Sequence, residues 1–207
     1  MNVEKIKNSF KYRQPILKKE LKHILSISNQ NTLNQTISYM VAFDLLKRLE
    51  NGIYYIPDSN PKFANLKPSL YDVINKKYLS NYSGFRAGSY LFYKYKFTTQ
   101  LSEYYEILSN NVSKNTRSKK EYNGKVIVSY PKFRINKDNI LYHEFLELIR
   151  NIKLSDNNQD NIKKLYIVYK SMKLNKEMLK KYSKYYKGKR LASVHKLVDK
   201  VIDYELA

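Results

Sequence analysis

The fold is decided by the stretch from Pro15 to Pro57, PILKKELKHILSISNQNTLNQTISYMVAFDLLKRLENGIYYIP. Apolar residues recur in it at helical spacing, which is typical of one face of an amphipathic helix. Two such faces follow each other: Leu17, Leu21, Ile24 and Leu25, then Leu33, Ile37, Met40 and Val41. The polar residues 28–31 separate them, and Ser28 or Asn31 is suited to cap the second helix. We therefore predict two short helices joined by a turn.

Two apolar runs, 45–49 and 53–56, come next and are joined by Glu50-Asn51-Gly52. Asn-Gly between apolar runs predicts a hairpin, because a type I′ turn needs positive φ at both of its central positions. Two helices, a turn and a hairpin, in this order, predict a winged helix-turn-helix over residues 1–58. The usual work of such a module is to bind DNA with its second helix.

The composition narrows the class of protein. The chain has 207 residues, of which 43% are hydrophobic, so it has enough apolar side chains for one large core or two small ones. We find no secretory signal pattern and no run of roughly 20 apolar residues, the length that spans a bilayer. The absence of cysteine excludes disulfides and thiolate metal sites. We therefore expect a cytoplasmic protein without a membrane partner.

The net charge of +21 comes from 39 Lys and Arg against 18 Asp and Glu. Codon bias of an AT-rich genome enriches lysine, but it does not explain the shortage of acidic residues, so a polyanionic partner is favoured. The charge is unevenly placed, since residues 1–58 hold nine basic and five acidic side chains. Lys114 to Lys137 holds eight basic residues and one acidic residue. The second half of the chain therefore carries most of the excess positive charge.

The rest of the chain predicts an α+β protein with a second domain. Prolines 57, 61 and 68 indicate that residues 59–80 form a linker with a short helix at 68–79. Residues 81–207 then form the second domain, in which Asn175 caps one of the last helices. Its expected elements are a helix at 84–95, strands at 103–109, 125–130 and 132–136, a loop at 110–124, a helix at 141–152 and two or three more helices.

Several short motifs in sequence order resemble the AbiEi-like antitoxins of type IV toxin–antitoxin systems. They are residues 46–57, Ser83-Gly84 with Ala87, Phe97-Thr98-Thr99-Gln100, Ser109-Asn110-Asn111, and a helix at 144–152 with a basic helical tail. The chain departs from the family at Lys96, where family members tend to have glycine, and in its uncharged second helix. The resemblance implies an N-terminal winged helix followed by an antitoxin domain that ends in helices.

The same resemblance implies a function in abortive infection, a form of phage defence. It implies a repressor that binds inverted repeats in its own promoter, as one copy or as two copies side by side. It also implies a partner, a nucleotidyltransferase-like toxin that the C-terminal domain counteracts. A second hypothesis is a stand-alone regulator whose C-terminal domain mediates self-association or partner binding.

Candidate DNA-binding residues lie on the outer face of the second helix. Asn and Gln pair with adenine in the major groove, and threonine contacts phosphate or a thymine methyl group. On the hairpin, cations and amides reach phosphates or the minor groove. The candidates are Thr32, Asn34, Gln35, Ser38 and Tyr39 on the helix and Lys47, Arg48 and Asn51 on the hairpin. The competing interpretation is that these polar side chains are only solvated.

Two further segments of the chain are rich in basic residues. The basic residues Lys114, Arg117, Lys119 and Lys120 suit a phosphate-binding loop, a toxin-binding loop or a solvated loop. Residues 180–187 alternate lysine with tyrosine, which suits stacking on single strands. Helical spacing favours the simpler interpretation for the tyrosines there, namely that most of Tyr182, Tyr185 and Tyr186 belong to the core.

We expect no catalytic residue, metal or cofactor. His23, His143 and His195 are scattered, and five glycines leave no phosphate-binding glycine loop. A metal-dependent nuclease needs clustered carboxylates, commonly with a lysine two residues later. The one such pair, Glu20-Leu21-Lys22, lies in a predicted helix, and the strand residues Glu103 and Glu106 have no such lysine. A nuclease is therefore the least favoured of the three hypotheses.

Overall fold

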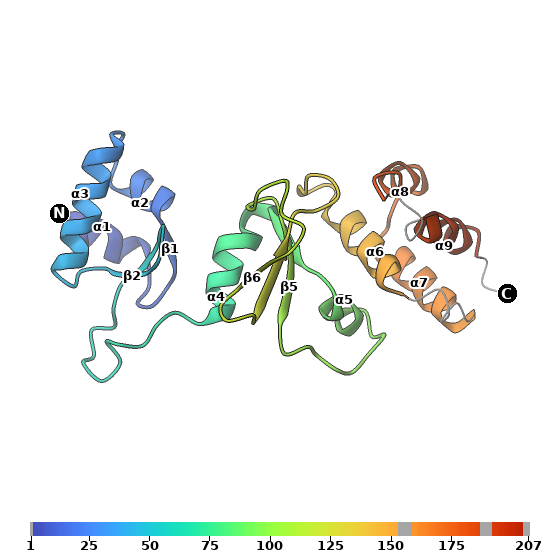
Figure 1. Cartoon of the computed structure of the whole chain (residues 1–207), viewed down its shortest axis with the longest axis horizontal. Coiled ribbons are helices and arrows are strands. Elements are labelled where there is room, and N and C mark those ends of the chain that lie inside the picture. Colours follow the sequence, from blue (N-terminus) through green and yellow to red (C-terminus); the bar gives the residue numbers. More distant parts are fainter. Residues whose placement is uncertain (1, 153–158, 187–191, 205–207) are drawn as a thin grey trace. The chain divides into compact units, whose positions relative to one another are not determined.

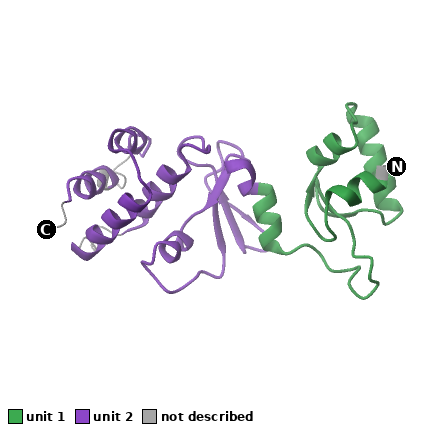
Figure 2. Ribbon diagram, turned by 180° about the vertical axis from the view of Figure 1, so that it is seen from behind, with its two compact units in different colours: residues 1–77 green, residues 78–207 purple. Residues whose placement is uncertain are grey.

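The computed structural model describes residues 2–152, 159–186 and 192–204, and it is of the α+β class with two small sheets. The chain divides into two compact units, Met1–Lys77 and Tyr78–Ala207 (Figure 2). No helix within the described residues is long and apolar enough to cross a membrane.

Unit 1 combines helices with a three-stranded antiparallel sheet of order β1-β3-β2 (Figure 1). The predicted helices and hairpin are confirmed, whereas the short strand β1, which pairs with β3, was not expected. Its elements are α1 (Asn2–Ser9), β1 (Ile16–Leu17), α2 (Lys18–Ile24), α3 (Gln30–Ala42), β2 (Lys47–Glu50), β3 (Ile53–Tyr55) and α4 (Leu70–Ile74), which a π-helical turn, η1 (Asn75–Leu79), continues.

The apolar stripes of α2 and α3 meet in the core of unit 1, as their spacing predicts, except that Leu17, expected on the first stripe, lies in strand β1 and outside this core. The buried side chains come from both helices, from α1 and from the sheet, so that these elements share one core. They are Ile6, Ile16, Leu21, Leu25, Leu33, Ile37, Met40, Leu46, Tyr54 and Ile56.

Helix α3 begins after Asn29, not after either of the two residues predicted to cap it. The Asn29 side-chain oxygen accepts hydrogen bonds from the backbone N–H groups of Asn31 at 2.8 Å and Thr32 at 3.1 Å. These two N–H groups have no partner within the helix, which is why an N-cap side chain accepts from them. The prediction of Ser28 or Asn31 was therefore wrong, because the helix starts at Gln30.

The hairpin is present, but its turn is not of the predicted type. Gly52 has a φ of 79°, whereas Asn51 is not among the residues with positive φ. A type I′ turn needs positive φ at both positions. A bulge between Arg48 and Glu50 shifts the register of β2 on β3, and one left-handed residue therefore suffices.

Unit 2 is a mixed four-stranded sheet of order β4-β5-β7-β6 with helices around it (Figure 1). Strands β5 and β7 are parallel, and the outer pairs are antiparallel. Its elements are η2 (Ser80–Tyr82), β4 (Gly84–Arg86), α5 (Ser89–Lys94), β5 (Tyr105–Ser109), β6 (Lys119–Glu121), β7 (Val126–Ser129), α6 (Ile140–Asn151), α7 (Gln159–Ser171), α8 (Lys176–Ser183) and α9 (Ala192–Ile202).

Three predictions for unit 2 need correction. Residues 84–86 form strand β4 instead of the start of a helix, and residues 119–121 form β6 within the expected loop. Residues 132–136 form no strand. A Cβ on Gly84 would lie 2.5 Å from the carbonyl oxygens of Leu108 and Tyr78, so this glycine permits a close backbone approach that periodicity does not reveal. The predicted cap is confirmed, because the Asn175 side chain accepts from the backbone of Met178.

The position where the resembling family tends to have glycine, Lys96, directly follows the C-cap residue of α5, Tyr95. Lys96 has a φ of 61°, in the left-handed region that glycine favours. The N–H of Phe97 donates to the carbonyl of Phe92 at 2.7 Å and that of Lys96 to Tyr93 at 3.1 Å. The rings of Phe92 and Phe97 meet edge to face, with centroids 5.9 Å apart. These contacts form a Schellman motif built on a lysine.

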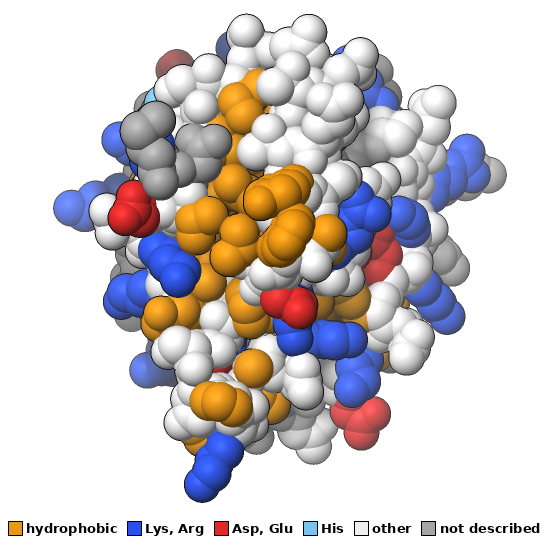
Figure 3. Space-filling view, turned by 90° about the vertical axis from the view of Figure 1, so that its left-hand side faces the viewer, with side chains coloured by type: hydrophobic (Ala, Val, Ile, Leu, Met, Phe, Trp, Pro, Cys, Tyr) orange, Lys and Arg blue, Asp and Glu red, His pale blue; other side chains and the backbone are white. Residues whose placement is uncertain are grey.

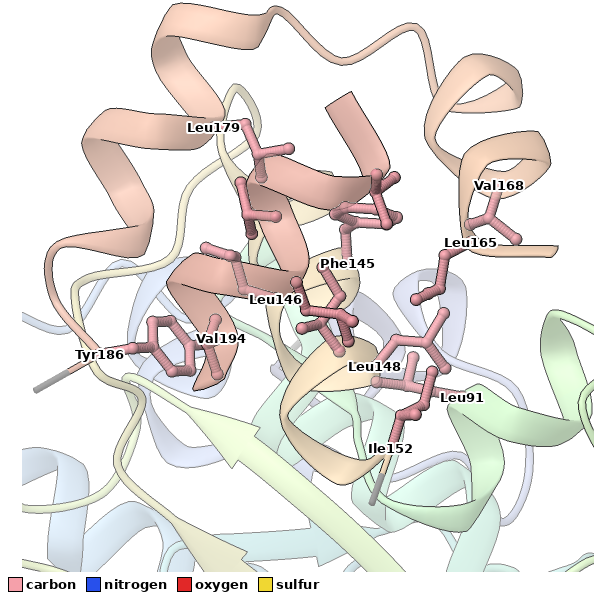
Figure 4. Close-up of a cluster of buried hydrophobic side chains, with 14 of the residues drawn as sticks. Leu91, Phe145, Leu146, Leu148, Ile152, Leu165, Val168, Leu179, Tyr186 and Val194 are labelled. Atoms are coloured by element: carbon pink, nitrogen blue, oxygen red, sulfur yellow. The ribbon is translucent and has the colours of Figure 1, made fainter. Parts of the chain in front are cut away.

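Helix α6 lies at the centre of unit 2. Seven consecutive residues, from His143 to Ile149, are buried, which is typical of a helix enclosed on all sides. Figure 4 shows Phe145, Leu146 and Leu148 of α6 among side chains of four other helices. Those labelled are Leu91 of α5, Leu165 and Val168 of α7, Leu179 of α8 and Val194 of α9.

Candidate nucleic-acid interface

The outer face of α3 presents all the candidate residues that the sequence placed there. Thr32, Asn34, Gln35, Ser38 and Tyr39 are exposed. They are exposed because Leu33, Ile37 and Met40 hold the opposite side of the helix in the core. The Asn34 carboxamide is 3.4 Å from that of Gln30, so it keeps most of its hydrogen-bonding capacity for another partner.

An aromatic pair extends this face at the end of α3. The rings of Tyr39 and Phe43 lie 4.4 Å apart, and the two residues are 59% and 61% exposed. Figure 3 looks onto the side of unit 1 where α3 lies and shows hydrophobic side chains gathered there. Sequence reasoning missed Phe43, although its place four residues after Tyr39 puts both on one helical face.

Helix α3 itself has no charged residue, and the cations of the helix-turn-helix are on the preceding helix, α2. Lys19 and Lys22 of α2 are exposed, and Lys18 is partly exposed. An uncharged helix next to a basic one is an arrangement in which hydrogen bonds select a partner while cations attract a polyanion.

The hairpin candidates differ in what surrounds them. Asn51 is exposed in the turn, and the exposed Arg48 lies against Tyr54, with Nη2 3.3 Å from the tyrosine hydroxyl. The Arg48 guanidinium is 5.7 Å from the centre of the same ring. By contrast, Nζ of Lys47 donates to the Ala64 carbonyl at 3.3 Å and to the Asn65 side chain at 3.0 Å. Lys47 therefore ties the hairpin to the segment that follows it.

The four cations of the basic segment 114–120 have different surroundings. Lys114 and Arg117 line a cavity of unit 2, whereas Lys119 and Lys120 belong to strand β6. Lys119 forms a salt bridge with Glu121, with Nζ 2.7 Å from Oε1. Neighbouring residues of a strand point to opposite faces, so Lys120 lies on the other side of the sheet from Lys119.

The tyrosines of the Lys/Tyr segment belong mostly to the core, as helical spacing predicts. Tyr186 is 1% exposed and donates its hydroxyl to Glu147 at 2.9 Å. Tyr182 stacks on Phe133 with ring centres 4.8 Å apart, whereas Tyr185 is 50% exposed. At most one of these three rings is therefore placed to stack on a base.

The histidines have structural surroundings. His143 is fully buried and stacks on Phe133 at 3.6 Å, and burial lowers its pKa from 6.5 to about 3. His195 lies between the Ser183 hydroxyl at 3.1 Å and the Tyr186 carbonyl at 3.2 Å. Within the described parts of the chain, no three His, Asp or Glu side chains are grouped so that they would hold a metal ion.

Comparisons with known proteins assign no family to the chain. No model of a protein family matches it, and a search of curated proteins finds no relative. The resemblance to the AbiEi-like antitoxins therefore stays a prediction that rests on the quoted motifs.

Proposed function

We propose that unit 1 is a winged helix-turn-helix that binds double-stranded DNA, with α3 in the major groove and the β2–β3 hairpin as the wing. The observation that carries the proposal is the outer face of α3, an exposed row of amide and hydroxyl groups on a helix that is capped at its start and anchored in the core. The order of elements and the sheet order β1-β3-β2 support it.

The residue types on this face suit base recognition. A side-chain amide donates to N7 and accepts from N6 of adenine, so Asn34 and Gln35 favour adenine in the operator. The exposed hydroxyls of Thr32 and Ser38 suit phosphate or base contacts. Arg48 and Asn51 on the hairpin are placed for the backbone or the minor groove, while Lys18, Lys19 and Lys22 of α2 add charge beside the helix.

The role of the DNA contact follows from the resemblance to the AbiEi-like antitoxins. On that basis the protein represses its own operon, and unit 2 counteracts a nucleotidyltransferase-like toxin. The excess of basic residues beyond residue 58 is consistent with further contacts to operator phosphates or to an acidic partner. The alternative is a stand-alone regulator, which shares the DNA binding but has no toxin.

Two experiments separate these claims. A gel-shift titration with the gene's own upstream region should show binding at least tenfold tighter than to a scrambled duplex of the same composition. Equal affinity for the two duplexes would remove the repressor claim. Co-expression with the adjacent gene should restore growth if that gene is toxic. No rescue, or a harmless neighbour, would leave the stand-alone regulator as the better account.

A further inference from the structure

Unit 2 contains a cavity of about 890 Å³ that the proposed DNA contact does not use. One wall is a face of the parallel strands β5 and β7, on which Glu106 is paired with Ile127 and Leu108 with Ser129. Helix α6 supplies Glu147, Arg150 and Asn151 to its lining. All the lining residues belong to unit 2.

Four cations from three segments of the chain line this cavity. Lys114 and Arg117 come from the loop before β6, Lys132 from the segment after β7, and Arg150 from α6. The N–H of Tyr130 donates to the Thr116 carbonyl at 2.9 Å, which holds the loop against the end of β7. The fold therefore brings basic residues from distant parts of the sequence to one hollow.

Arg150 is held in place by an acidic partner on its own helix. Nη1 of Arg150 lies 3.1 Å from each carboxylate oxygen of Glu147, which is 2% exposed and also accepts the Tyr186 hydroxyl. This pair uses a single nitrogen of the guanidinium, so the other N–H donors remain for a ligand. Across the described residues no salt bridge reaches Lys114, Arg117 or Lys132. Lys132 is close enough to Glu147 for its charge to act on that carboxylate, whereas Lys114 and Arg117 add positive charge to the cavity without a salt bridge among the described residues. Cations gathered at one place repel each other, and an anion relieves that repulsion.

The size and chemistry of the cavity narrow the class of ligand. Small-molecule sites commonly measure 300–1,000 Å³, so a single phosphate ion would leave most of this space empty. Arginine and lysine together are the usual binders of phosphate groups. The same cavity holds Glu106, whose carboxylate accepts hydrogen bonds from hydroxyl or amino groups. A nucleoside phosphate offers both an anionic end and hydroxyl or amino donors.

We propose that this cavity binds a small phosphorylated ligand of nucleotide size, with Lys114, Arg117, Lys132 and Arg150 on its phosphates. Glu147 is a positioning residue that holds Arg150. Side-chain cations replace the phosphate-binding glycine loop that the sequence lacks. This inference does not depend on DNA binding by unit 1.

Isothermal titration calorimetry on the full chain, with ATP as the probe, tests the proposal. We expect a saturable complex with a dissociation constant below 1 mM in 0.1 M salt. The double variant K114A/R117A should weaken ATP binding at least tenfold. The matched control R134A/K137A removes one arginine and one lysine, also three residues apart and exposed, from outside the cavity, and it should change the affinity less than twofold.

The binding of other ligands shows which part of ATP the cavity recognises. Inorganic pyrophosphate should bind at least tenfold more weakly than ATP, and adenosine should not bind measurably. No saturable binding of ATP, or equal loss in both double variants, would overturn the proposal. Equal affinity for pyrophosphate and ATP would overturn the assignment of ligand size. Binding of a short single-stranded oligonucleotide but not of ATP would instead make the cavity part of a nucleic-acid surface.

Discussion

Helix α3 of unit 1 and helix α6 of unit 2 are similar in length but differ in how much of their surface is buried. Helix α3 (Gln30–Ala42) buries one stripe and leaves an uncharged polar face in solvent. Helix α6 (Ile140–Asn151) buries seven residues in a row, among them one histidine and two glutamates. The polar residues on the outer face of α3 are therefore available to a partner, whereas the buried His143, Glu144 and Glu147 of α6 are enclosed in the fold.

The largest expected difference in the free energy of unfolding is between substitutions of two aromatic residues, one on each helix. Phe145 is fully buried in α6 and Tyr39 is 59% exposed on α3. Phe145→Ala should lower the free energy of unfolding of unit 2 by about 4 kcal/mol. Tyr39→Ala should change that of unit 1 by less than about 0.5 kcal/mol. Hydrogen exchange read separately for the two units checks both values, and similar losses would refute the contrast.

The buried histidine of α6 predicts a pH dependence that no residue of α3 has. Burial lowers the pKa of His143 from 6.5 to about 3, so the unfolded chain binds a proton in this range and the folded chain does not. Stability should therefore fall as the pH falls, with a slope that approaches about 1.4 kcal/mol per pH unit below the unfolded pKa and a total loss of about 1.6 kcal/mol between pH 6.5 and pH 5.

Urea unfolding at several pH values tests this sign. His143→Leu should remove the contribution of this histidine to the slope of the unfolding free energy against pH, whatever the substitution does to stability at neutral pH. The exposed His23 provides the control, since His23→Asn should leave the slope as it is. An unchanged slope in His143→Leu would show that the histidine is not held neutral by burial.

The cap of α3 should matter to stability more than its neighbour in the turn. Asn29→Ala removes the acceptor for two backbone N–H groups and should destabilise unit 1 by about 1 kcal/mol. Ser28 is exposed and is not the cap, so Ser28→Ala should cost less than about 0.5 kcal/mol. Thermal unfolding of the two variants compares them, and a larger loss from Ser28→Ala would contradict the observed start of the helix.

One substitution in unit 2 is predicted to raise stability. Lys96 has a φ of 61° at the end of α5, and glycine adopts such a conformation without steric cost. Lys96→Gly should stabilise unit 2 by about 1 kcal/mol. Lys96→Ala keeps the Cβ and should bring no such gain. If both variants behave alike, the lysine conformation carries no strain.

The helical spacing of unit 1 predicted the exposed residues of α3 and both stripes of its core apart from Leu17, because a surface helix alternates its faces regularly. The same reasoning failed at Gly84, where a close approach to the carbonyls of Leu108 and Tyr78 favours a strand. It also missed β6, because Lys119–Glu121 shows no apolar alternation and is held by its pairing with β7.

The cavity of unit 2 was beyond prediction from sequence. Lys114, Arg117, Lys132 and Arg150 belong to separate segments, and only the long-range packing of the sheet against α6 brings them together. The sequence marked Lys114 and Arg117 as basic, but it offered no reason to group them with Glu106 and Arg150. Local spacing contains no information about such contacts.

The central claim is that the amide face of α3 selects a DNA sequence. Its most direct test is fluorescence anisotropy with the upstream duplex and a scrambled duplex, comparing the wild type with N34A/Q35A. The control N8A/Q159A removes the same side-chain types from exposed helical positions elsewhere. We predict that N34A/Q35A lowers the affinity ratio between the two duplexes at least tenfold and leaves binding to the scrambled duplex unchanged. An unchanged ratio, or an equal fall in the control, would contradict the account.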